Sequence, residues 1–225
     1  MSVAPLPRVV APPDTSRLIP SRFPPVGTFD SVTSADDLHA VMELEGWTND
    51  RLVMPRLKRL AKHDWVFGRP NASVVMAAFL HGSPNGLRFS GPELGAWYAS
   101  TEIETAILEV ANGLRKEIAL SALTEMRQTY RRYLTDLGGP YVDIVGTHPE
   151  CHDPNVATYP VAQTFGATVR DAPDLAGIRY ESVRRSGHDN WVCFRPLLVG
   201  NVRQADHVRL EVQMTGKVVV RRLPA

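Results

Sequence analysis

The stretch Gly86–Asn112, GLRFSGPELGAWYASTEIETAILEVAN, decides how this chain folds. It begins with a turn-rich segment that carries Arg88, and a short apolar and aromatic run of strand length follows at residues 96–99. Four apolar residues then recur at the spacing of a helix that packs on a core: Ile103, Ala106, Ile107 and Val110. The stretch therefore predicts a loop, a strand and a helix in succession.

The start of this helix carries a capping signal. Ser100 or Thr101 is suited to the N-cap, and Glu104 follows Thr101 by three residues, as in a capping box. Glu109 does not belong to the apolar set, and two turns into the helix it can point at the end of the preceding strand. The unit thus offers Arg88, Tyr98 and Glu109 from three successive pieces, although each alone also has an ordinary structural interpretation.

Two motifs in this order resemble the RES domain, a family named for arginine, glutamate and serine. The first contains RFSGP and WYASTEIETAILE, between Arg88 and Glu109. The second is GIRYESVRRSGHDNWVCFRP, at residues 177–196. The resemblance covers roughly residues 17–223. It implies an α+β, ADP-ribosyltransferase-like single domain with mixed central β-sheets flanked by helices.

Matching the motif letters assigns Arg88, Tyr98, Glu109 and Ser182 as the expected catalytic residues. The family also carries an arginine–aromatic pair near its start, which makes Arg22 a second expected ligand of the substrate; Phe23 stands where tyrosine is common. His81 ends an apolar segment beside a Gly/Pro loop and is a further candidate for binding, although a helix C-terminus also favours histidine there.

The resemblance implies a toxin of a bacterial type II toxin–antitoxin system that consumes NAD as a substrate. The cognate antitoxin would carry a helix-turn-helix part, so any contact with nucleic acid would be indirect. The expected reaction is cleavage of the nicotinamide–ribose bond, by hydrolysis or phosphorolysis. Two alternatives stay open, namely transfer of ADP-ribose to a cellular protein and a non-catalytic binding module.

This inventory of side chains suits that chemistry. Arg88 and Arg22 would grip the pyrophosphate, and Glu109 would stabilise the positive charge that develops on the ribose. Tyr98 would stack on nicotinamide, and the Ser182 hydroxyl would fix the ribose or the amide. The sequence contains no Rossmann glycine fingerprint and no phosphate-binding Gly-Lys-Ser/Thr loop, which disfavours an oxidoreductase or a P-loop enzyme.

Bulk properties agree with one cytoplasmic domain. The 225 residues carry a formal net charge of +1, which gives no general attraction to nucleic acid. There is no secretory signal pattern and no apolar run long enough to span a membrane. The two cysteines favour free thiols over a disulfide framework. The proline-rich residues 1–16 predict an extended N-terminal arm, and residues 17–225 form the expected domain.

Two clusters of polar residues remain ambiguous. The loop HPECHD at residues 148–153 collects ligand-type side chains, but it lacks the paired spacing of a zinc site, and no metal is expected. Arginines and tyrosines interleave at residues 127–133, which suits either stacking on bases or a strand with two differently solvated faces. The basic face of residues 50–63 suits exposure to solvent, or binding of an acidic partner or of phosphates.

Periodicity and turn signals place the remaining elements. Helices are predicted at residues 34–46, 50–63, 74–80 and 156–169. Strands are predicted at residues 115–124, 178–182, 191–202, 207–213 and 217–223, with a hairpin turn at Thr215-Gly216.

Overall fold

The computed structural model describes residues 6–23 and 57–224, together with residues 27, 29–34, 36, 37 and 40. Most of the helix predicted at residues 34–46 and the first half of the helix predicted at residues 50–63 lie outside the described residues. The second half is wrong, because residues 58–61 are not helical and Lys62–Asp64 form a 3-10 helix.

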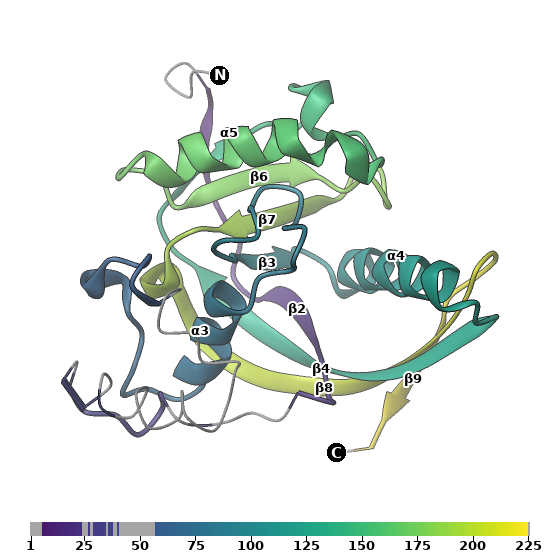
Figure 1. The fold of residues 1–225 in the computed structure, drawn as a ribbon, viewed down its shortest axis with the longest axis horizontal. Coiled ribbons are helices and arrows are strands. Elements are labelled where there is room, and N and C mark those ends of the chain that lie inside the picture. Colours follow the sequence, from purple (N-terminus) through teal and green to yellow (C-terminus); the bar gives the residue numbers. More distant parts are fainter. Residues whose placement is uncertain are drawn as a thin grey trace.

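Within the described residues, nine strands form one sheet in the order β1-β5-β6-β7-β3-β2-β4-β8-β9 (Figure 1). Their bounds are Arg8–Val10 (β1), Thr15–Pro20 (β2), Trp97–Ser100 (β3), Glu125–Leu137 (β4), Pro140–Asp143 (β5), Gly177–Glu181 (β6), Asp189–Cys193 (β7), Val199–Gln213 (β8) and Val219–Leu223 (β9). Only the pair β5–β6 is parallel. The helices that flank the sheet are α3 (Ala72–Leu80), α4 (Ile103–Ser121) and α5 (Tyr159–Asp171). The predicted α+β class is confirmed, with one mixed sheet.

Successive side chains of β3 and β7 point to opposite faces of the sheet, where they pack in two different hydrophobic clusters. Trp97 and Ala99 pack in the cluster that contains α3, together with Trp191. Tyr98 and Val192 instead pack against the cluster that contains α5. Figure 1 shows α5 running along β6, with β7 next to β6, and α4 beside the long curved ribbon of β4 and β8. Tyr98 therefore lies on the face of β3 that α5 covers.

Helix α4 is longer than the sequence predicts. The strand predicted at residues 115–124 is wrong, because the helix continues to Ser121 and ends at Ala122 in the left-handed conformation, with φ 54°. Buried residues of α4 continue the helical spacing past the predicted end: Ile107, Ala111, Leu114 and Ile118. Burial of this stripe against Leu18, Tyr130 and Leu210 outweighs the weak alternation that suggested a strand.

The predicted capping box at the start of α4 is also wrong. The N-cap is Glu102, and its side chain makes no capping hydrogen bond. Thr101 instead accepts a hydrogen bond from the indole Nε1 of Trp191, at 3.0 Å. Glu102 accepts hydrogen bonds from Arg185 and, at 3.1 Å, from His188. Partners on β7 and on the loop between β6 and β7 thus bind the side chains that a local cap would use.

Two described pieces of the predicted N-terminal arm are strands of the sheet, at Arg8–Val10 and from Thr15 onward. Strand β1 pairs with β5, and Arg8 forms a 2.7 Å ion pair with Asp174. Strand β2 already begins at Thr15, one residue before the predicted end of the arm. Extended proline-rich backbone is compatible with an edge strand, which explains why the sequence looked like a free arm.

Most of the other predicted elements are confirmed. Helices α3 and α5 and strand β6 fall where expected, and Gly216 turns the β8–β9 hairpin with φ 91°. The strands predicted at residues 191–202 and 207–213 are instead β7 and a continuous β8. Pro196 separates them, because it begins a short 3-10 turn at residues 196–198.

Candidate functional site

Glu109 lies at the centre of a hydrogen-bond network on the α4 side of the sheet. Its Oε1 accepts a hydrogen bond from Ser182 Oγ at 2.7 Å and another from Asn190 Nδ2 at 2.8 Å. The side chain is half-buried, between the exposed and the core positions of α4. Two residues far from it in the sequence therefore fix the orientation of this carboxylate.

Ser182 uses its whole hydrogen-bonding capacity within the protein. Its hydroxyl donates to Glu109 and accepts from the backbone N–H groups of Arg184 and Arg185, each at 3.2 Å. A serine hydroxyl has one donor and two acceptor sites, so all three are occupied. Ser182 is only 2% exposed. The predicted residue is thus in the site, where it holds Glu109.

Arg88 is buried, and the loop at residues 148–153 holds it. Its Nη1 donates to the carbonyl oxygens of Cys151 and Asp153, at 2.9 and 2.7 Å. The loop that looked like a partial metal site therefore contacts Arg88 through its backbone. Burial raises the pKa of the Cys151 thiol to about 11, so this cysteine stays protonated and weakly nucleophilic at neutral pH.

Tyr98 connects β3 to the loop that carries Arg88. Its hydroxyl accepts a hydrogen bond from Phe89 N at 3.0 Å and lies 3.1 Å from Ser90 Oγ. Burial raises the pKa of Tyr98, and the bonds to Ser90 and Phe89 act against that shift. The phenol is therefore neutral at physiological pH, while its ring is half-buried.

Tyr180 connects the surroundings of three predicted residues. Its hydroxyl is within electrostatic reach of Glu109, Tyr98 and Arg88. Burial is the main cause that raises the pKa of Tyr180 well above its ordinary value, and the charge of Glu109 adds to it. Its ring also packs edge-on against Phe89, with centroids 4.8 Å apart. Tyr180 lies within the second motif, at residues 177–196, but the sequence analysis gave it no role in the site.

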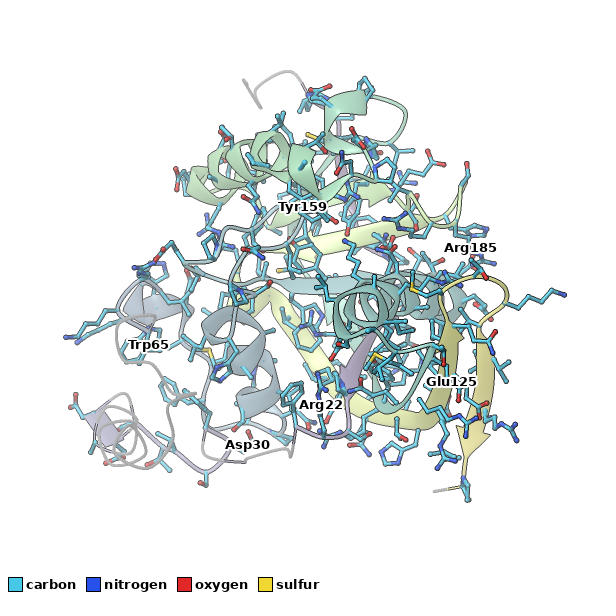
Figure 2. All side chains as sticks on the ribbon, turned by 45° about the vertical axis from the view of Figure 1, so that its right-hand side comes forward. Arg22, Asp30, Trp65, Glu125, Tyr159 and Arg185 are labelled. Carbon is cyan, nitrogen blue, oxygen red and sulfur yellow. The ribbon has the colours of Figure 1, made fainter. Side chains whose placement is uncertain are left out.

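Two cationic side chains lie beside the ring of Tyr159, at the start of α5; Figure 2 labels this tyrosine. The guanidinium of Arg88 and the Nζ of Lys116 lie 5.0 and 5.6 Å from the centroid of this ring. Desolvation is the first cause that lowers the pKa of Lys116, followed by the charges of Arg184 and Arg88. Three cations and a single aromatic ring next to Glu109 suit an anionic ligand.

The structure does not place Arg22 or His81 in this group. Arg22 is exposed after β2, where its guanidinium lies 5.2 Å from the ring of Phe23, and Figure 2 shows α4 between Arg22 and Tyr159. His81 is the C-cap of α3, which packs with Trp97 on the other face of β3. The pattern of single residues could not indicate on which side of the sheet each one would lie.

Arg17 is a residue that the sequence analysis passed over. Strands β2 and β3 pair only at Ser16 and Ser100, and Arg17 follows that pair. Its Nη1 donates to the Tyr98 carbonyl at 3.0 Å, and its guanidinium lies 4.6 Å from the centroid of Trp97. Burial lowers the pKa of Arg17 to about 10, and Nε has no hydrogen-bond partner among the described residues. An arginine between Ser16 and the apolar pair Leu18-Ile19 was the available signal.

Three other expectations can be compared with the described residues. The interleaved arginines of β4 have partners within the protein: Arg132 contacts Ser16 and Asp206, and Arg127 pairs with Glu125. Among the described residues, no three His, Cys, Asp or Glu side chains gather closely enough to hold a metal ion. The described helices include none that is long and apolar enough to cross a membrane.

Comparison with known proteins identifies the motifs. The profile of the RES domain matches residues 56–213 of this chain. The chain is also similar to the uncharacterized protein y4oC of Sinorhizobium fredii (strain NBRC 101917 / NGR234), with 30% identity over 129 residues. That alignment covers 56% of this chain and 55% of y4oC, so the chain matches about half the length of this relative.

Proposed function

Because this chain belongs to the RES domain family, whose members are toxin-like and associated with NAD-related activity, we propose that it cleaves the nicotinamide–ribose bond of NAD. The RES domain has an ADP-ribosyltransferase-like fold, and the mixed sheet with its flanking helices agrees with that fold. Water or phosphate would accept the ADP-ribosyl group, and the reaction would deplete NAD.

The observation that supports this reaction best is the carboxylate of Glu109, which Ser182 and Asn190 hold in one orientation and whose charge acts on Tyr180. Loss of nicotinamide builds positive charge on the ribose ring, as in other glycosidic cleavages. A carboxylate that is already oriented stabilises that charge without reorganising during the reaction. In this proposal Glu109 supplies the electrostatic stabilisation of the transition state.

The other residues bind and orient the substrate. Arg88 is rigid because Nη1 is bound to the 148–153 loop, and its remaining N–H groups can meet the pyrophosphate. Lys116 and Arg184 supply the additional positive charge that was expected from Arg22. The half-buried ring of Tyr98 offers a flat surface for nicotinamide.

In the cell we propose that the protein is a cytoplasmic toxin whose cognate antitoxin, with a helix-turn-helix part, blocks access to Glu109. This proposal rests on the family, since the structure contains a single chain. Expression of the toxin alone should arrest bacterial growth, and coexpression of the antitoxin should restore it.

The test is NAD loss with product analysis, using purified protein with and without phosphate or cell lysate. Nicotinamide with free ADP-ribose would support hydrolysis, and a phosphorylated ADP-ribose would support phosphorolysis. Nicotinamide release only with lysate, together with a labelled protein, would identify an ADP-ribosyltransferase instead. Intact NAD in every mixture, with folded protein, would favour a non-catalytic binding module.

A further inference from the structure

We propose that Ser100 and Asn190 are positioning residues, which act with Ser182 to fix Glu109 through one carboxylate oxygen and leave the other for the substrate. The inference rests on the proposed function of Glu109 and adds a role for two residues outside the predicted site. Both lie deep in the sheet, with Ser100 3% and Asn190 2% exposed.

Strand register brings the two residues together. Ser100 on β3 is directly opposite Asn190 on β7 in the antiparallel pair. The Ser100 hydroxyl donates to Asn190 Oδ1 at 2.6 Å, and Asn190 Nδ2 donates to Glu109 Oε1 at 2.8 Å. The sheet thus carries a continuous hydrogen-bonded path from β3 through β7 to α4.

Each hydrogen bond in this path has only one possible donor. A carboxylate only accepts hydrogen bonds, so the amide of Asn190 must turn its NH2 group toward Glu109. Its carbonyl oxygen then faces Ser100, whose hydroxyl must donate. Because the Ser100 hydroxyl fixes the amide, Ser100 controls the orientation of Glu109 without touching it.

The two oxygens of Glu109 are not equivalent. Hydrogen bonds from Ser182 and Asn190 both end at Oε1, and within the described part of the chain no hydrogen bond reaches Oε2. Buried or half-buried carboxylate oxygens normally find donors. Oε2 is therefore the oxygen that would accept a hydroxyl group of the ribose, while Oε1 holds the side chain in place.

Steady-state kinetics of the variants Ser100→Ala and Asn190→Ala tests whether these two residues position Glu109. We expect kcat to fall about tenfold or more, with the KM for NAD within about twofold, because a misoriented Glu109 weakens transition-state stabilisation and not binding. Thr15→Val is the matched control: it removes a buried hydroxyl that pairs with Thr135 in the same sheet, and both constants should stay unchanged. A raised KM with unchanged kcat, or no change at all, would overturn the proposal.

A second measurement separates this inference from the proposed function. If the wild-type protein leaves NAD intact, the proposed function fails, but the coupling to Glu109 can still be measured by thermal unfolding. The loss of Tm in the double variant Asn190→Ala/Glu109→Gln should be smaller than the sum of the single losses. The pair Thr15→Val/Glu109→Gln should be additive, and additivity for Asn190 as well would refute the coupling.

Discussion

Glu109 and Arg88 are held in different ways, although both come from one short stretch of sequence. Side chains from β6–β7 and its loop fix the carboxylate, whereas backbone carbonyls of the 148–153 loop fix the guanidinium. Every residue has a backbone carbonyl, so the amino-acid sequence does not show which carbonyls accept hydrogen bonds. This explains why the sequence could indicate Arg88 but not what orients it.

Substitution of Glu109 by glutamine should remove the charge while nearly preserving the shape of the side chain. We expect kcat for NAD cleavage to fall by about a hundredfold or more, as for other losses of electrostatic stabilisation in a transition state. Glu104→Gln is the control, because Glu104 is exposed on the first turn of the same helix. Equal turnover by the two variants would remove Glu109 from the reaction.

Arg88→Lys should weaken substrate binding. Lysine keeps the charge but loses the planar fork that can hold the loop carbonyls and a pyrophosphate together. We expect the KM for NAD to rise about tenfold, the size of one lost charge-assisted hydrogen bond. Arg127→Lys, at an exposed ion pair on β4, should leave KM unchanged. An unchanged KM in Arg88→Lys would dismiss the pyrophosphate role.

At the scale of elements, the close contact between α5 and the Arg88 loop positions the site. Gly166 lies on the buried face of α5, and a Cβ there would come 2.0 Å from the Phe89 carbonyl oxygen. The loop backbone thus packs directly on the helix, which keeps Phe89 N beside the hydroxyl of Tyr98. Only glycine permits this approach.

Gly166→Ala should therefore destabilise the protein by about 2 kcal/mol or more, since either α5 or the loop must move. Gly113→Ala provides a matched control in α4, where nothing lies within 4 Å of the added Cβ. That variant should gain about 0.5–1 kcal/mol from helix propensity. Urea unfolding of both variants checks the prediction, and similar stabilities would show that the α5 contact can relax.

At the scale of the whole molecule, ion pairs connect segments that are distant in the chain. Arg185 and His188, on the loop between β6 and β7, contact Glu102 at the start of α4. The hydrogen bond from Arg185 is the main cause that lowers the pKa of Glu102. Asp136 and Asp174 also have lowered pKa values, through hydrogen bonds from Asp14 N and from Arg8.

These lowered pKa values give the stability a defined pH dependence. A carboxyl group with a lower pKa in the folded state binds protons more readily when unfolded. Such a group contributes fully to the free energy of unfolding when the pH is above its pKa in the unfolded state. This contribution is lost as the pH falls through its pKa in the folded state, below about pH 4. Thermal unfolding from neutral pH to about pH 3 should show Tm falling mainly at the acid end.

Glu102→Gln should show a shallower loss of Tm with acid, because one of the groups that takes up a proton on unfolding is gone. Glu104→Gln removes an exposed charge from the next turn and should follow the wild-type curve. If the two variants have the same acid dependence, the contact between Glu102 and Arg185 contributes nothing to stability.

The sequence by itself determined the local unit of loop, strand and helix and most of the helices and strands, and its motifs named Arg88, Tyr98, Glu109 and Ser182 as candidates. These follow from periodicity and from a motif, which are properties of neighbours along the chain. It also misassigned residues 115–124, because a helix buried on one stripe overrode a short alternation.

Only the tertiary structure decided which of the candidates share one face of the sheet. The register of β3, β6 and β7 places Asn190 between Ser100 and Tyr180, and α4 then brings Glu109 onto them. The same topology puts Arg22 and His81 elsewhere and brings in Lys116. Side-chain convergence depends on strand pairing and helix packing across long separations, and no local pattern of residues encodes those distances.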